Sequence, residues 1–315
     1  MLRYIVRRVL FMLPVALLVS ILTFMLIHLV PGDPARVLLG EEATPQTVAA
    51  LQHQLGLDKP LPQQFLLWFG QALHGNLGMS IQLQQPVTQA LLQRLPVTLE
   101  LGLVSLIYSL LLAIPLGVYS ATHRHSWLDW LVNVSALLGT AIPNFVLALV
   151  LILLFAVSLR FFPPGGYKPF IKDPATNIRD LILPMIALGT GAVAVNLRQI
   201  RASMVEVLEQ DYVRTARAKG LPERRVNYIH ALRNSLIPLL TIVGLQIGSI
   251  LGGAFVIEEI FLWPGVGKLA VDSIFAKDYP VVQGVVLLVA FSYMLVNLLV
   301  DISYVFLDPR IRLNR

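Results

Sequence analysis

The stretch LGLVSLIYSLLLAIPLGVYSA, residues 101–121, decides the fold class because it contains no charged side chain. A helix needs about 20 apolar residues to cross the roughly 30 Å hydrocarbon core of a bilayer. An open sheet would leave the backbone groups at its edges without hydrogen-bond partners in lipid. The stretch is therefore predicted to be a transmembrane helix.

The composition of the whole chain supports a helical membrane protein. Of its 315 residues, 56% are hydrophobic and 13% charged, and the mean hydropathy is +0.73. Soluble domains have about 45–50% apolar and about 25% charged residues. There is no cysteine, which excludes disulfides, thiolate metal sites and a cysteine nucleophile. The basic residues lie between apolar runs rather than in one patch, so membrane orientation explains the pI near 9.7 better than nucleic acid does.

Five further apolar runs bring the predicted number of spans to six: Val9–Val30, Trp130–Leu159, Leu181–Leu197, Ser235–Ile257 and Val281–Val300. The first is too long for a cleaved signal peptide, so we expect it to be retained. The third is long enough to be tilted or to run past the bilayer. The fourth is short and is expected to extend through Arg198, whose stem can reach the interface.

Lys and Arg set the predicted orientation. With the N-terminus inside, 15 of the 24 lie in cytoplasmic segments and nine in outer segments, so both termini are expected to be cytoplasmic. This divides the chain into a cytoplasmic N-terminus with the first span (1–30), an extracytoplasmic segment (31–96), a permeation core (97–308) and a cytoplasmic tail (309–315).

The extracytoplasmic segment is predicted to contain short helices. Thr44 is a candidate N-cap, Pro45 a first helical residue and Gly56 a helix stop. A second helix is expected from near Pro62 to before Gly75. Its apolar side chains are expected to lie on the membrane surface or on the bundle of spans: Phe65, Leu66, Trp68 and Phe69.

The cytoplasmic connection 202–234 is basic and amphipathic. Tyr212, Val213 and Ala216 continue an apolar face at helical spacing, Gly220 is a natural helix stop and Pro222 a first residue of the next helix. Two interpretations fit these residues: a docking point for a soluble partner, or a basic loop that only satisfies the charge bias of inner loops.

The segments Asp211-Tyr-Val-Arg-Thr-Ala-Arg-Ala-Lys-Gly220 and His230-Ala-Leu-Arg-Asn-Ser-Leu-Ile-Pro238 resemble the permease subunits of binding-protein-dependent ABC importers, in the dipeptide, oligopeptide and nickel branch. The general family motif is Glu-Ala-Ala, three residues and Gly, with a later Ile-x-Leu-Pro. Here Arg214-Thr-Ala216 replaces Glu-Ala-Ala, and Pro238 comes later than the general spacing. Further marks of the branch follow in order along the chain: Val30–Pro34, Gly56–Pro60, Arg94–Leu101, Phe261–Gly267, Asp278–Pro280 and Asp308–Arg312.

The resemblance implies a function without catalytic groups in this chain. It implies half of a translocation path in the bacterial inner membrane, with di- or oligopeptides as cargo and nickel or glutathione as alternatives. The implied partners are a second six-span permease, cytoplasmic ATP-binding subunits that carry ATP and Mg, and an extracytoplasmic substrate-binding protein. The implied ATPase-coupling residues form a helix: Asp211, Tyr212, Arg214, Thr215, Ala216, Arg217, Ala218, Lys219 and Gly220.

Other features are given structural interpretations. Gly244, Gly248 and Gly252 form a ridge for helix packing, within the chain or against the second permease. Glu258 and Glu259, at the outer end of the fifth span, are expected on a solvated rim. Four prolines in or beside the spans are expected to make static kinks: Pro14, Pro115, Pro143 and Pro184.

Two other classes stay open. An ion-driven secondary transporter would require several buried acids or an unwound helix at the midplane, and only Asp301 comes close. A membrane enzyme would require a clustered catalytic set near one interface. No Walker A sequence is present, and His123-x-His125 is not expected to bind metal, so we predict neither ATP hydrolysis nor a metal site in this chain.

Overall fold

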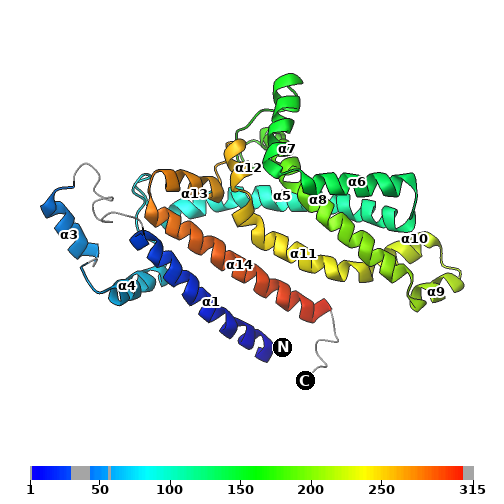
Figure 1. The fold of residues 1–315 in the computed structure, drawn as a ribbon, viewed down its shortest axis with the longest axis horizontal. Coiled ribbons are helices and arrows are strands. Elements are labelled where there is room, and N and C mark those ends of the chain that lie inside the picture. Colours follow the sequence, from blue (N-terminus) through cyan, green and yellow to red (C-terminus); the bar gives the residue numbers. More distant parts are fainter. Residues whose placement is uncertain (1, 30–42, 56–57, 308–315) are drawn as a thin grey trace. The chain divides into compact units, whose positions relative to one another are not determined.

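The computed structural model describes residues 2–29, 43–55 and 58–307, and this part of the chain is helical (Figure 1). Its only β-pairing is an isolated bridge between Met79 and Pro86. The elements are α1 Leu2–Leu29, α3 Pro45–Leu55, α4 Leu61–Leu73, α5 Val87–Thr122, α6 Trp127–Ala141, α7 Asn144–Leu151, η2 Ile152–Ser158, α8 Pro174–Leu208, α9 Asp211–Ala218, α10 Glu223–Arg225, η3 Val226–Ala231, α11 Leu232–Gly253, α12 Phe255–Ile260, α13 Val266–Phe275 and α14 Tyr279–Leu307.

Five helical segments of the described chain are long and apolar enough to cross a membrane, and a sixth span is obtained if α6 and the α7–η2 segment count as one. The prediction of a continuous third span is wrong, because this pair is bent by 101°. Pro143 lacks a backbone N–H, and Ile142 before it is extended at φ −84°, ψ 119°. Pro143, which was predicted to kink one helix, therefore separates α6 from α7.

Two predicted spans are longer in the structure. α5 has 36 residues and begins at Val87, and α8 has 35 residues and begins at Pro174. At 1.5 Å per residue each is more than about 50 Å long, so its ends extend beyond a roughly 30 Å hydrocarbon core. The start of α8 is fixed by Asp173, whose side chain accepts a hydrogen bond from the Thr176 N–H at 3.1 Å.

The chain forms two compact units, and α5 and α14 each contribute residues to both. Unit 1 comprises Met1–Val97 and Pro264–Leu295. Its core joins α5, α13 and α14 through Val87, Ala90, Leu91, Val266, Leu269, Val281 and Val285. At its edge, Asp278 is buried and accepts hydrogen bonds from the Ser80 hydroxyl and, at 3.1 Å, from the Gln82 N–H.

The short helices predicted between the first two spans are present in unit 1. Thr44 caps α3 by accepting a hydrogen bond from the Thr47 N–H at 3.2 Å, whereas Gly56 lies outside the described residues. In α4 the rings of Phe65 and Trp68 lie 5.6 and 5.8 Å from that of Phe24 in α1. These two aromatic residues therefore pack on the first span, as one of the two predicted placements requires.

Unit 2 comprises Thr98–Trp263 and Val296–Arg315, and α8 packs against α6, α7 and α11 within it. Asn196 of α8 is fully buried and exchanges two 3.1 Å hydrogen bonds with Gln246 of α11. On the predicted ridge, a Cβ atom at Gly244 would collide with Val300, so α11 and α14 approach closely there. Gly248 is buried and Gly252 exposed, and the ridge as a whole stays a prediction.

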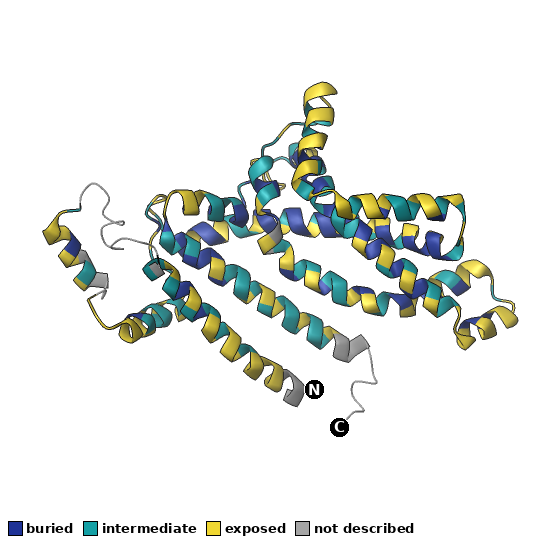
Figure 2. Ribbon diagram, in the orientation of Figure 1, coloured by how far each residue is buried: buried dark blue, intermediate teal, exposed yellow. Residues whose placement is uncertain are grey.

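The expectation of a solvated rim is wrong for Glu258. The residue is 0% exposed and its carboxylate accepts a 2.6 Å hydrogen bond from the Thr98 hydroxyl. Glu259 is half-buried. Apolar side chains take the exposed positions instead, and Figure 2 shows exposed residues along most of α1, where Phe11 and Leu13 are among them. Such surface is expected of a chain whose solvent is lipid.

Candidate functional site

The connection between α8 and α11 folds into a short helix with two distinct faces. α9 has only eight residues, Asp211–Ala218. Val213 and Ala216, three positions apart, are buried against Val226, and Leu208 and Leu221 pack around them. A helix this short is not stable alone in water, so this small apolar cluster is what holds it.

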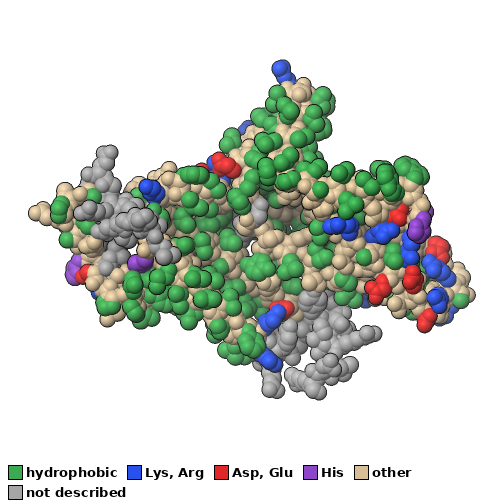
Figure 3. All heavy atoms as spheres, viewed as in Figure 1, with side chains coloured by type: hydrophobic (Ala, Val, Ile, Leu, Met, Phe, Trp, Pro, Cys, Tyr) green, Lys and Arg blue, Asp and Glu red, His purple; other side chains and the backbone are tan. Residues whose placement is uncertain are grey.

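The opposite face of α9 is polar and open. Asp211, Arg214, Thr215 and Arg217 are exposed. Asp211 lies in the first turn and Arg217 in the last, which suits the helix dipole. In Figure 3, charged side chains of both signs gather around α9 and the elements next to it.

One residue of the predicted apolar face lies elsewhere. Tyr212 is 42% exposed, and its hydroxyl accepts a 2.7 Å hydrogen bond from the Asn234 side-chain amide near the start of α11. Tyrosine has a polar hydroxyl as well as an apolar ring, and here the hydroxyl is hydrogen-bonded to Asn234 while the ring stays exposed. Tyr212 thus joins α9 to α11 at the rim of the cluster.

The end of α9 confirms Gly220 as a helix stop. Gly220 has φ +75°, and its N–H donates to the Arg217 carbonyl at 2.9 Å. The Leu221 N–H donates to the Ala216 carbonyl at 3.4 Å, and Leu221 packs against the same cluster as Ala216. This is a Schellman ending, which places a glycine at the left-handed position. Pro222 precedes α10 rather than beginning it.

An ion pair stabilises the segment that leads from α9 to α11. Arg217 donates two hydrogen bonds to the carboxylate of Glu223, at 2.9 and 3.3 Å, which closes the loop between α9 and α10. The chain then passes through the π-helix η3 into α11. π-Helical turns are rare in proteins overall, and those that occur are often located at functional sites.

The turn between α5 and α6 also contacts this segment, which the sequence reasoning missed. Arg124 of that turn lies 3.0 Å from Glu209, at the end of α8, and donates to the Val205 carbonyl at 2.9 Å. One level deeper, Arg201 of α8 pairs with Asp129 of α6 at 2.9 Å. The only sequence signal for this pair was the position of its residues: Asp129 lies in the first turn of α6, and Arg201 follows the apolar part of α8.

The described residues contain no group of three or more His, Cys, Asp or Glu side chains arranged to hold a metal ion. His123 instead stacks on Tyr119, with ring centroids 4.3 Å apart. In α8, a Cβ atom at Gly189 would lie 2.7 Å from the ring of Tyr108, so this glycine serves the close packing of α8 on α5.

Comparisons with known proteins give one consistent family. Residues 113–313 match the model described as "Binding-protein-dependent transport system inner membrane component", and residues 1–102 match the model for the N-terminal part of the membrane component of such systems. Together these two matches include the connection that carries α9.

Full-length relatives carry transport names. A putative peptide transport system permease protein of Brucella abortus (strain 2308) is 44% identical over 98% of both chains. A di/tripeptide transport system permease protein of Pseudomonas aeruginosa (strain UCBPP-PA14) is 45% identical over 100% of both. A glutathione transport system permease protein of Escherichia coli O6:H1 is 41% identical over 99% of both.

Proposed function

Because the chain belongs to the family of binding-protein-dependent transport system inner membrane components, we propose that it forms half of the translocation path of an ATP-driven importer for di- or oligopeptides. It is a multi-pass inner-membrane permease subunit and not itself an enzyme. The observation that carries the mechanism is α9, an exposed polar helix fixed between two membrane-spanning helices.

In this proposal α9 docks on a cytoplasmic ATP-binding subunit. Five basic residues lie between the start of α9 and the end of α10: Arg214, Arg217, Lys219, Arg224 and Arg225. Only Asp211 and Glu223 oppose them there, and Arg217 already pairs with Glu223. A docking cleft with acidic residues would complement this surface and set the register of the contact.

Closure of the ATP-binding subunits would then move the spans. α9 is joined through one short turn to α8, and through α10 and η3 to α11. α8 and α11 are themselves joined by the hydrogen bonds between Asn196 and Gln246. A displacement of α9 therefore acts on a connected pair of long helices, which is what rocking between inward-open and outward-open states requires.

The proposed orientation follows from this role. α9 and both termini lie in the cytoplasm, while the segment 31–96 lies on the side where the substrate-binding protein arrives. The second six-span permease completes the path, and ATP and Mg are bound by partner subunits. The distribution of Lys and Arg supports the same orientation.

Glutathione is a second candidate cargo within the same branch, because one relative at 41% identity carries that name. It is itself a small peptide, so the same path suits both. Uptake assays with labelled dipeptide, oligopeptide and glutathione, each with its binding protein, separate these cargos.

The docking proposal is tested by cross-linking from α9. The chain has no cysteine, so Thr215→Cys supplies the only thiol, on the exposed face. We expect a thiol-reactive cross-linker to join it to an ATP-binding subunit in native membranes. Lys172→Cys, exposed before the other end of α8, is the matched control and should react only from the outer side. A Thr215→Cys thiol labelled from outside, or never cross-linked to an ATP-binding subunit in assembled complexes, would overturn the proposal.

A further inference from the structure

The cytoplasmic end of α8 is joined to α5 and α6 through one buried carboxylate. Asp129 of α6 is 5% exposed. Its oxygens accept hydrogen bonds at 2.9 and 3.0 Å from Nε and Nη2 of Arg201 in α8. They also accept from the Ser120 hydroxyl of α5, from the His125 N–H in the turn and from the Asn133 amide. A carboxylate with this many partners connects all three helices at one level.

A second ion pair repeats the connection nearer to α9. Arg124 binds Glu209 and the Val205 carbonyl, so the α5–α6 turn holds the last turn of α8 from outside. This pair is more exposed, with 32% and 66% of the two side chains accessible. Exposed ion pairs contribute little to stability, whereas an arginine fork on a buried carboxylate fixes geometry. The deeper pair is therefore the one expected to transmit force.

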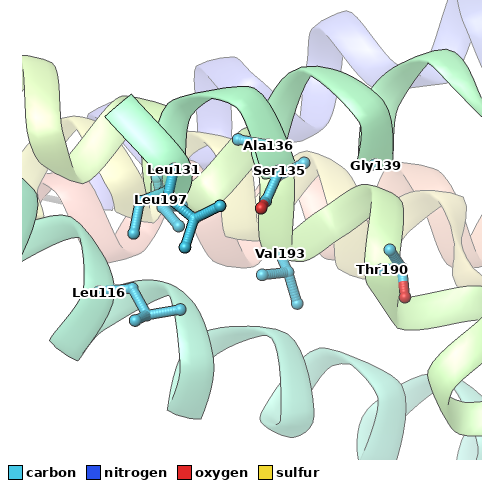
Figure 4. Close-up of a pocket in the computed structure, with 10 residues that line it drawn as sticks. Leu116, Leu131, Ser135, Ala136, Gly139, Thr190, Val193 and Leu197 are labelled. Atoms are coloured by element: carbon cyan, nitrogen blue, oxygen red, sulfur yellow. The ribbon is translucent and has the colours of Figure 1, made fainter. Parts of the chain in front are cut away.

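On one side of this polar cluster the three helices leave an open pocket. It has a volume of about 260 Å³, is lined by residues of α5, α6 and α8, and opens to the surface, where its lining residue Leu131 is 43% exposed. Figure 4 shows Leu116, Ser135 and Val193 around it, one from each helix. Side chains that face an open pocket make no contact across it, so the helices are joined there only through the residues beside the pocket.

The pocket ends where the ion pair begins. Its lining residues Leu116, Val132 and Leu197 lie about one turn of helix from Ser120, Asp129 and Arg201 along α5, α6 and α8 respectively. The polar cluster thus joins the three helices directly beside the open pocket.

We propose that Asp129 and Arg201 are positioning residues of transport: they lock the cytoplasmic ends of α5 and α6 to α8, so that a displacement of α9 moves all three helices as one body. The inference rests on the proposed function, because it assumes that α9 receives the displacement. Neither residue touches cargo or nucleotide in this role. They act by making α5, α6 and α8 move together as one rigid group.

The first test measures peptide uptake per ATP hydrolysed, in proteoliposomes of the complete importer with its binding protein. Asp129→Asn keeps the size of the side chain and removes its charge. We expect assembly and ATP hydrolysis to persist while uptake per ATP falls roughly tenfold, within the usual range of coupling between sites. Asp272→Asn is the matched control, at an exposed carboxylate paired with Lys268 in unit 1. Unchanged uptake per ATP in assembled Asp129→Asn would overturn the proposal.

If Asp129→Asn does not assemble, Arg201→Lys replaces it. Lysine keeps the charge but cannot bind the carboxylate with two nitrogens. We expect a smaller loss of uptake per ATP from Arg201→Lys, again without loss of assembly. Wild-type uptake per ATP in this variant would contradict the role given to the arginine fork.

The second test restores the lock by other means. A Cβ atom at Gly139 of α6 would lie 3.3 Å from that of Ala194 in α8, and disulfides join Cβ atoms about 3.5–4.5 Å apart. In a chain without cysteine, Gly139→Cys with Ala194→Cys forms the only thiol pair. We expect its oxidation to leave transport unchanged by itself and to restore uptake per ATP in Asp129→Asn. Loss of transport on oxidation alone, or no rescue, would overturn the single-body proposal.

The docking helix supplies the comparison that separates this inference from the proposed function. If Ala216→Asp in α9 uncouples transport but Asp129→Asn does not, only the inference fails. If neither variant changes uptake per ATP, the proposed coupling function fails first.

Discussion

At its first residues α8 is fixed by hydrogen bonds from neutral side chains, whereas its last turns are held by ion pairs. Near Pro174, the Asn177 amide donates to Glu100 at 2.7 Å, and the Tyr167 hydroxyl donates to the same carboxylate at 3.0 Å. Near Leu208, the pair of Arg124 with Glu209 is partly exposed.

The difference separates two kinds of charged residue. The half-buried carboxylate of Glu100 accepts hydrogen bonds from neutral donors, and the loss of such hydrogen bonds costs stability. At the other end, the exposed pair of Arg124 and Glu209 costs little to break, while the buried Asp129 joins α8 to α5 and α6. We therefore expect substitutions near the first residues of α8 to change stability, and substitutions near α9 to change coupling.

The largest expected effect is from Ala216→Asp. It places a charge in the cluster of Val213 and Val226, where burial of an unpaired carboxylate costs several kcal/mol (about 3 or more), so α9 should leave its seat. We expect the protein to remain in the membrane with ATP hydrolysis retained and uptake per ATP lowered more than tenfold. Ala276→Asp, an exposed site in unit 1, controls for the added charge. Normal assembly with normal transport would refute the role of α9.

Thr98→Val tests the end of the bundle at which α8 begins. It removes the hydroxyl that donates to the buried Glu258 at 2.6 Å, which should destabilise the fold by about 2 kcal/mol. We expect the midpoint of thermal unfolding in detergent to fall by a few degrees while uptake per ATP stays at the wild-type value. Thr140→Val is the control, because its exposed hydroxyl only bonds its own helix. A change in uptake per ATP with an unchanged unfolding midpoint would show that this hydrogen bond acts in coupling rather than in stability.

Gly220→Ala probes the ending of α9. Nothing lies within 4 Å of the added Cβ, so the cost is that of a left-handed residue, about 1–2 kcal/mol. Gly75→Ala in unit 1 has the same cost, with φ +79° and open space. We expect similar losses of thermal stability in both, with reduced uptake per ATP only for Gly220→Ala. Equal uptake per ATP in the two variants would show that the shape of this ending has no part in coupling.

The smallest effect is expected from Tyr167→Phe, at about 0.5–1 kcal/mol for one hydrogen bond. Burial, together with the hydrogen bond to Glu100, raises the pKa of Tyr167 to about 12. The unfolded pKa is about 10, so the stabilisation is fully present below that pH and is lost as pH rises towards 12. We expect the unfolding midpoint of Tyr167→Phe to lack the part of the decrease above pH 10 that the wild type owes to Tyr167. Tyr228→Phe, at an exposed site, is the control. The same alkaline loss in Tyr167→Phe would refute the assignment.

The sequence predicted the helical class and the C-terminal end of α9, because both follow from local rules. Apolar length identifies spans, and Gly220 ends a helix through its own backbone freedom. The break at Pro143 was harder to predict, since Pro115 and Pro184 lie within continuous helices of the same structure. Whether a proline kinks or separates a helix depends on what surrounds it.

Contacts distant in sequence were not predictable from one chain. Asp129 and Arg201 are 72 positions apart, and Thr98 and Glu258 are 160 apart. Alone in the sequence, Asp129, Arg201 and Glu258 each resemble an ordinary charge at the end of a span, and Thr98 resembles an ordinary polar residue there. Only the packing of α5, α6, α8 and α12 shows that these charges are partnered.

The most direct test of the account compares Ala216→Asp and Thr98→Val in one assay of peptide uptake and ATP hydrolysis, with the complete importer in proteoliposomes. The account predicts that Ala216→Asp lowers uptake per ATP more than tenfold, while Thr98→Val keeps the wild-type ratio at a temperature where it is folded. Equal ratios in both variants and the wild type would contradict the claim that α9 couples ATP hydrolysis to transport.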